Sequence, residues 1–315
     1  MRASTHRPAA SVLPPTRNGV GPSCVGLPAG HWPTILDFLV QRFPAQPRAL
    51  WMQRMAQGLV VDEFARPVTA GRNYEAHLRV YYYRDCDTEA RIPFDEVVLH
   101  QDDHLVVVDK PHHLPVVPSG RYLQETVLVR LKRKLGLDTL VPIHRIDRDT
   151  AGLVMFSVQA QTRDAYQALF RERQIHKSYE AVAPRRDDLA LPLVRRSRIV
   201  QGTHFLLQCE AEDGAPNVTT HVELLRTMGP LALYRLRPVS GHRHQLRVHM
   251  AALGIPIVGD GLYPVLTPQS DLFPEPALQL LARSLSFTDP LSGQMRRFES
   301  RRTLTLAPVD AGPSD

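Results

Sequence analysis

The chain has 315 residues, 43% of them hydrophobic and 22% charged, and no apolar run approaches the roughly 20 residues that span a bilayer, so membrane insertion is not expected. Its three cysteines are scattered and form no CxxC pair, which predicts neither a disulfide framework nor a zinc site and fits the reducing cytoplasm. The formal net charge of +6 favours a polyanionic partner, and nucleic acid is the leading candidate.

The first third of the chain predicts a small domain behind a polar extension. Residues 1–32 carry Pro, Gly and Ser without the apolar core of a signal peptide, and we expect a disordered extension there. Apolar residues at helical spacing and a later run of strand formers predict a compact domain over residues 33–84. The polar, turn-rich stretch that follows predicts a linker over residues 85–96.

The main domain is expected over residues 97–302, with a tail over residues 303–315. Strand and helix patterns alternate here without the regular rhythm of βαβ units. This favours an α+β fold with a mixed, mostly antiparallel sheet and flanking helices. A Gly-Pro turn between two strand patterns predicts a hairpin. The expected strands cover residues 104–111, 152–158, 178–184, 221–228 and 232–239, and the expected helices cover residues 162–174 and 243–254.

The segment HRIDRDTAG concentrates charge in front of an apolar strand pattern. Asp147 and Asp149 form a DxD, which could hold a divalent metal if both lie on one side of a strand, but the neighbouring arginines would repel a cation. Alternatively, one carboxylate faces an arginine and acts on an organic substrate as nucleophile or base. The third interpretation is a structural ion-pair loop.

The segment SGHRHQLRVHM carries His242, His244 and His249. The last two are five residues apart and fall on different faces of a helix, and no Cys or paired acid lies nearby, so a metal site is not expected. The basic runs RLKRKLG (130–136) and RRSR (195–198) could meet phosphates or be solvated surface. P-loop, GxGxxG, HExxH and GxSxG motifs are absent from the sequence.

Four ordered motifs together resemble the RluA-type pseudouridine synthases over residues 92–300. They are VVVDKPHHLPVVPSG (106–120), HRIDRDTAGLVMF (144–156), HKSYEAV (176–182) and SGHRHQLRVHMAALGIPIVGDGLY (240–263). The family pattern is HRLDxxTSGLLL, then KxY, then TGRxHQIRVH followed by GxPIxGD. Residues 33–84 resemble more loosely the small RNA-binding domain named for ribosomal protein S-four.

The resemblance implies a cofactor-free isomerase that converts uridine in ribosomal or transfer RNA into pseudouridine within a central cleft. We expect a monomer. Asp147 would be the essential carboxylate, Arg247 would pair with it, and Tyr179 would lie against the base and accept the proton from carbon 5. Arg145 would act as a wedge or phosphate contact. The other residues expected to bind RNA are Lys110, His144, Lys177, Arg243 and His244.

Three positions depart from the family pattern. Ala151 replaces Ser, His242 replaces Arg, and Leu281 replaces a late His. The last two changes leave open which RNA is the target and how the protein binds it. Two other hypotheses stay open from the sequence: a noncatalytic RNA-binding or ribosome-assembly protein on the same fold, and a metal-dependent nucleotide-sugar transferase using the DxD.

Overall fold

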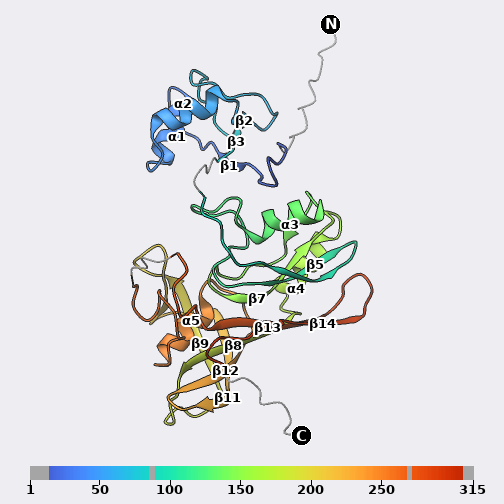
Figure 1. Cartoon of the computed structure of the whole chain (residues 1–315). Helices are drawn as coiled ribbons and strands as arrows, with labels where there is room; N and C mark the ends of the chain where they lie inside the picture. Colours follow the sequence, from blue (N-terminus) through green and yellow to red (C-terminus); the bar gives the residue numbers. More distant parts are fainter. Residues whose placement is uncertain (1–13, 85–88, 268–271, 308–315) are drawn as a thin grey trace. The chain divides into compact units, whose positions relative to one another are not determined.

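The structure is a computed structural model that describes residues 14–84, 89–267 and 272–307. Parts of the expected extension (1–13), linker (85–88) and tail (308–315) lie outside the described residues. Two compact units are distinguished (Figure 1). The first contains the described residues up to Glu89 together with Ser119–Gln124, and the second contains Ala90–Pro118 and the described residues from Glu125 onward.

The first unit packs two helices and a small antiparallel sheet around its own core. Thr34 caps the first helix through a reciprocal capping box with Asp37, as a Thr three residues before an acid favours. The apolar sides of both helices meet the sheet around Trp51, which is 1% exposed. Its elements are β1 (Ser23–Gly26), α1 (Ile35–Arg42), α2 (Arg48–Ala56), β2 (Val60–Asp62) and β3 (Arg79–Tyr82), with strand order β1-β3-β2.

Two of the expected boundaries differ from this structure. Ser23–Gly26 was expected within a disordered extension, but its backbone pairs with β3 and so belongs to the first unit. Residues 90–96 were expected to be linker, but they belong to the second unit. Ile92 is 1% exposed there, and Arg130 donates to the carbonyls of Ile92 and Phe94 at 2.6 Å. Tertiary contacts therefore order a stretch whose composition indicates a loop.

The second unit is built on one large sheet with the strand order β10-β9-β11-β12-β8-β13-β7-β5-β4, to which β14 and β6 pair at β13 and β7. Each pairing is antiparallel except that of β13 with β7, so the prediction of a mixed, mostly antiparallel sheet is confirmed. The strands are β4 (Val97–Gln101), β5 (Leu105–Lys110), β6 (Val141–Pro142), β7 (Ala151–Ser157), β8 (His176–Pro184), β9 (Leu193–Gln201), β10 (Gln208–Ala211), β11 (Val218–Met228), β12 (Leu231–Pro238), β13 (Leu280–Thr288) and β14 (Met295–Glu299).

Three helices of this unit are α3 (Val127–Leu135), α4 (Arg163–Arg171) and α5 (Gln245–Ala252). The expected hairpin is present as β11 and β12, joined at Gly229–Pro230. The strand β9 was not predicted, because the run RRSR hides an alternation in which every second side chain is turned inward. None of the helices in the described ranges is long and apolar enough to cross a membrane.

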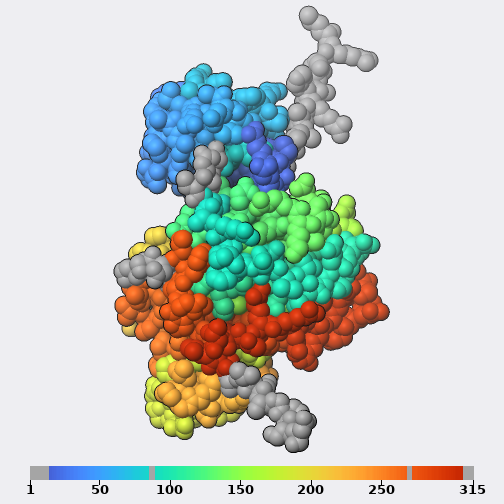
Figure 2. Space-filling model, in the orientation of Figure 1, coloured from blue at the N-terminus to red at the C-terminus, as the bar shows by residue number. Residues whose placement is uncertain are grey.

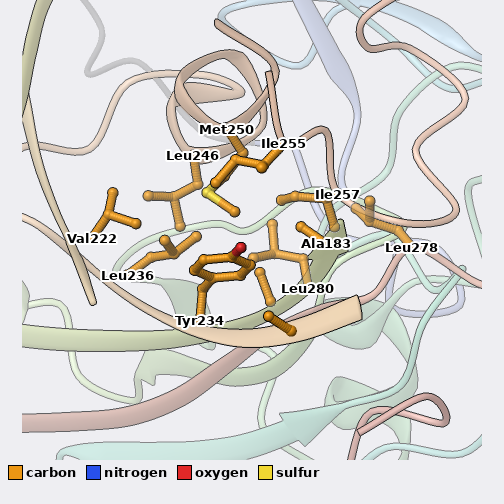
Figure 3. Packing of buried hydrophobic residues seen from close by; sticks show 12 residues of the cluster. Ala183, Val222, Tyr234, Leu236, Leu246, Met250, Ile255, Ile257, Leu278 and Leu280 are labelled. Carbon is orange, nitrogen blue, oxygen red and sulfur yellow. The ribbon is translucent and has the colours of Figure 1, made fainter. Parts of the chain in front are cut away.

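A cluster of buried apolar side chains fixes α5 against the sheet. Figure 3 shows Leu246 and Met250 of α5 facing Tyr234 and Leu236 of β12, and Tyr179 of β8 packs against the same cluster. The cluster therefore holds α5 against the sheet on the side to which Tyr179 also packs.

The strands β13 and β14 contact segments that lie much earlier in the sequence. In Figure 2 the surface of the red C-terminal strands lies beside that of residues near 100, and Arg296 binds Asp102 at 2.8 Å. β13 also places Ala282 opposite both Tyr179 of β8 and Gly152 of β7. The strand therefore connects the two strands that carry candidate site residues.

Candidate active site

Asp147 lies in the loop between β6 and β7, not within a strand. Its carbonyl accepts the Thr150 amide at 3.2 Å, and all residues of β7 that follow are buried. The carboxylate remains accessible, with 29% of the side chain exposed. A buried strand thus holds a short polar loop whose carboxylate is still open to a ligand.

Arg247 of α5 reaches this carboxylate across 100 positions of sequence. Its Nη1 donates to Oδ2 of Asp147 at 3.3 Å, and its side chain is only 3% exposed. Burial alone would lower the pKa of Arg247, but its ion pairs with Asp260 and Asp147 raise it above its ordinary value. The guanidinium is therefore a fixed positive charge beside Asp147.

His244 faces the other oxygen of the same carboxylate. Its Nε2 lies 3.8 Å from Oδ1 of Asp147, and its Nδ1 lies 3.0 Å from the Tyr263 hydroxyl. That hydroxyl accepts the Gln208 amide at 2.8 Å, so its own hydrogen is free for Nδ1, and this favours the tautomer with Nε2–H toward Asp147. Burial lowers the pKa of His244 although the charge of Asp147 opposes this, so a neutral imidazole is expected at pH 7.

Tyr179 of β8 belongs to the same surroundings. Its ring packs against the cluster between α5 and the sheet. Burial, and after it the charge of Asp147, raises the pKa of the Tyr179 hydroxyl above its ordinary value. The hydroxyl is therefore protonated at neutral pH.

The second aspartate of the DxD turns to a separate set of partners. Asp149 accepts from Nε of Arg148 at 2.8 Å and lies 3.4 Å from Nδ1 of His113. Burial would raise the pKa of Asp149, but His113 and the charge of Arg148 bring it below its ordinary value. Asp147 and Asp149 thus each face basic groups and do not form a paired oxygen site, which gives no support to the transferase hypothesis.

Lys110 was expected to bind RNA, but it is fully buried at the end of β5. Its Nζ donates to the carbonyls of Arg148 at 2.8 Å and Pro111 at 2.9 Å. Burial lowers its pKa to about 7, against the opposing charges of Asp149 and Asp147. Lys110 is therefore placed to support the loop that carries Asp147 rather than to meet RNA at the surface.

His144 and Lys177 also make contacts within the protein. The His144 ring stacks on Phe170 at 4.5 Å between centroids, and its Nε2 accepts the Met155 amide at 3.1 Å. Burial, assisted by the charge of Lys177, lowers the pKa of His144 to about 3. Lys177 donates to the Ser240 carbonyl at 3.0 Å, and burial lowers its pKa to about 8.

The exposed cations near the site are Arg145 and Arg243. Arg145 makes no hydrogen bond or ion pair within the part of the chain that the structure describes. Arg243 donates to the carbonyls of Phe205 and Leu206 at 3.2 and 3.1 Å, which ties it to a loop but leaves it exposed. Both side chains are accessible to a polyanion.

The other basic and histidine-rich runs contribute partly to the interior. Arg195 of the RRSR run pairs with Glu210, while Arg196 and Arg198 are exposed. His249 is buried, with Nε2 2.9 Å from the Ser197 hydroxyl, whereas His242 is exposed. Among the described residues, no group of three or more His, Cys, Asp or Glu side chains is placed to hold a metal ion.

Two residues of this arrangement were not singled out from the sequence. Asp260 binds Arg247 through both carboxylate oxygens, at 2.6 and 2.8 Å, and the Tyr263 hydroxyl orients His244. Both lie in the stretch GIPIVGDGLY, where an aspartate follows a buried apolar run and a glycine. Leu281, where the family pattern has His, is buried opposite Ala151.

Comparisons with known proteins identify the family of the chain. The family model described as RNA pseudouridylate synthase matches residues 104–252. The dual-specificity RNA pseudouridine synthase RluA of Pasteurella multocida is 33% identical over 211 residues, covering 64% of this chain and 91% of that protein. An uncharacterized RNA pseudouridine synthase of Synechocystis is 28% identical over 234 residues, covering 73% and 79%.

The fold is shared with two solved human proteins. RNA pseudouridylate synthase domain containing 1 matches with a TM-score of 0.54 at 19% identity, covering 68% of this chain and 86% of that one. RNA pseudouridylate synthase domain containing 4 matches with a TM-score of 0.50 at 24% identity, covering 65% and 87%. With its ordered motifs, its fold and its relatives in agreement, the chain belongs to the RluA-type RNA pseudouridine synthases, isomerases that act on RNA.

Proposed function

We propose that this chain isomerises specific uridines in ribosomal or transfer RNA, with Asp147 as the catalytic carboxylate. The observation that carries the proposal is the contact between Asp147 and Arg247, in which a buried, fixed cation lies against a partly exposed carboxylate and orients it. The reaction breaks the bond between the ribose and nitrogen 1 of uracil and forms one from the same carbon to carbon 5. The proton of carbon 5 is released, and nitrogen 1 gains one, so the product is an isomer.

Asp147 serves this reaction in its ionised form. As a nucleophile it would attack the sugar carbon, and as a base it would remove the neighbouring ribose proton. Either role needs the carboxylate charged and open to the substrate, which its partial exposure and its neighbour Arg247 support. His244 lies on the side of the opposite oxygen, with Nε2 3.8 Å from Oδ1, too far for a hydrogen bond in this structure.

Tyr179 is proposed to meet the base after it leaves the RNA stack. Extruding a nucleotide costs a few kcal/mol, and a base on an aromatic ring regains about 1–3 kcal/mol. The ring is held by the core beneath α5. Because the raised pKa keeps its hydroxyl protonated, accepting the proton from carbon 5 requires the hydroxyl to pass on its own proton in the same step.

Binding of the rest of the RNA is proposed to use exposed cations and the first unit. Arg145 and Arg243 are accessible to phosphates, and each neutralised phosphate adds affinity that falls with salt. The likeness of residues 33–84 to the S-four type of domain supports RNA binding by the first unit. Action in the cytoplasm as a monomer completes the proposal.

The test compares wild type with Asp147→Asn, an isosteric change that removes only the charge. RNA from cells lacking the gene, labelled with tritium at uridine carbon 5, releases tritium on modification. We expect loss of release with normal folding and retained RNA binding; wild-type turnover by Asp147→Asn would reject the site. Mapping pseudouridines in deleted cells, complemented with either form, identifies the target. Binding without product from wild type would instead favour the noncatalytic RNA-binding protein.

A further inference from the structure

Arg247 is shared by two carboxylates in an unequal way. Asp260 takes Nε and Nη2 at 2.8 and 2.6 Å in a two-point pair, while Asp147 receives one contact from Nη1 at 3.3 Å. A two-point pair between a guanidinium and a carboxylate is the strongest geometry available to these groups. Asp147, the carboxylate that is proposed to react, therefore makes the weaker of the two interactions with Arg247.

Asp260 is itself held firmly. Its side chain is 1% exposed, and Oδ1 also accepts the backbone amides of Leu262 and Tyr263 at 2.9 and 3.1 Å. These bonds fix the carboxylate in the turn after the stretch GIPIVGD. Because Asp260 cannot easily follow a moving arginine, it sets the position and the plane of the guanidinium.

We propose that Asp260 is a positioning residue that occupies one edge of Arg247, so that Asp147 faces the guanidinium without being clamped by a two-point pair. This inference rests on the proposed role of Asp147. A carboxylate bound at two points would have to break both bonds before meeting the sugar. With a single, longer contact, Asp147 still faces the positive charge of Arg247 and remains free to reach the substrate.

Asp260→Asn tests this directly, because the amide keeps an oxygen for the backbone amides and loses the charge. Arg247 would then be neutralised by Asp147 alone and drawn toward it. We expect kcat to fall about 10²-fold, the size of effect that a small misplacement of a reacting group produces, with little change in the apparent KM. A reduced kcat with an unchanged KM distinguishes this role from a loss of RNA binding.

The chain offers a matched control in Asp289, which follows β13. Its side chain is also 1% exposed, it binds Nε of Arg296 at 2.7 Å, and its Oδ1 accepts the amides of Leu291 and Ser292 at 3.0 Å. Within the described residues it has no contact with Asp147, Arg247 or Asp260. Asp289→Asn therefore removes the same kind of structural bonds and should leave both kcat and KM unchanged.

The full-length variants are assayed on tritiated total RNA from cells lacking the gene, with urea unfolding to set conditions in which each is folded. Asp260→Glu retains the charge but shifts the carboxylate, and it is expected to keep more of the wild-type kcat than Asp260→Asn does. If Asp260→Asn matches Asp289→Asn in kcat while Asp147→Asn is inactive, the inference is overturned. If Asp260→Asn does not fold, a wild-type kcat in Asp260→Glu overturns it, because the position of the carboxylate would then not matter. Activity of Asp147→Asn instead rejects the proposed function.

Discussion

Gly152 lies where β7 meets β13, and replacing it with alanine should damage the molecule more than its size suggests. Its φ is +108°, and an added Cβ would lie 2.3 Å from the Ala282 carbonyl oxygen and 2.7 Å from the Ala282 nitrogen. The positive φ costs an alanine about 1–2 kcal/mol. Forcing a buried group against backbone adds about 1–3 kcal/mol, so we expect Gly152→Ala to lower the free energy of unfolding by about 2–5 kcal/mol.

Gly136 separates these two contributions. It ends α3 with a φ of +67°, and an added Cβ would meet nothing within 4 Å. Gly136→Ala should therefore cost only the backbone part, about 1–2 kcal/mol. Urea unfolding of both variants at constant pH measures the difference directly.

Gly152→Ala should also reduce turnover under conditions in which the protein is folded. Ala282 lies opposite Gly152 on one side and Tyr179 on the other, so displacement of β13 changes the spacing between Tyr179 and the Asp147 loop. An unfolding free energy of Gly152→Ala equal to that of Gly136→Ala would refute the reasoning, because the close contact with Ala282 would then carry no cost.

Other changes test separate parts of the site and its support. Tyr179→Phe should keep RNA affinity, because the ring remains, and lower single-turnover tritium release by about 10²-fold or more; unchanged release would remove the hydroxyl from proton transfer. Burial lowers the pKa of His249 to about 4, whereas histidine in an unfolded chain has a pKa of about 6.5. The contribution of neutral His249 to the free energy of unfolding is therefore intact above pH 6.5, and about 3 kcal/mol of it is lost as the pH falls to 4. His249→Asn should lose less stability than wild type between pH 7.5 and 4.5 in urea unfolding, with His221→Asn, an exposed histidine, as control; equal losses would contradict this. Arg145→Gln should weaken RNA binding and reduce the slope of log affinity against log salt by about one; an unchanged slope in filter binding would place Arg145 away from phosphate.

The sequence predicted those elements whose buried and exposed positions match the apolar and polar pattern of their own residues. The hairpin of β11 and β12 alternates in burial around a Gly-Pro turn, and β7 is a continuous apolar run, so both could be read from the residues alone. β1 could not, because the four residues Ser23–Gly26 are too few to show a pattern, and their place in the sheet comes from pairing with Arg79–Tyr82. In β9 the inward position of Arg195 depends on Glu210, which lies on β10.

The site divides in the same way. The ordered motifs pointed to Asp147, Tyr179 and Arg247, and the structure places Arg247 in contact with Asp147. The alternative in which a strand would turn both aspartates to one side finds no support, because the loop directs Asp149 to Arg148 and His113. The two-point pair between Arg247 and Asp260 depends on the angle between α5 and the turn that follows it. Spacing along the chain does not predict that angle.

The place of β13 also determines when during translation the enzyme can become active. Residues 280–288 lie near the C-terminal end of the chain but fill the middle of the sheet, between β7 and β8 (Figure 1). A nascent chain that has not yet released this strand from the ribosome has two open strand edges where the halves of the sheet should join. We therefore expect ribosome-bound chains to be inactive and prone to association through these edges until β13 has emerged.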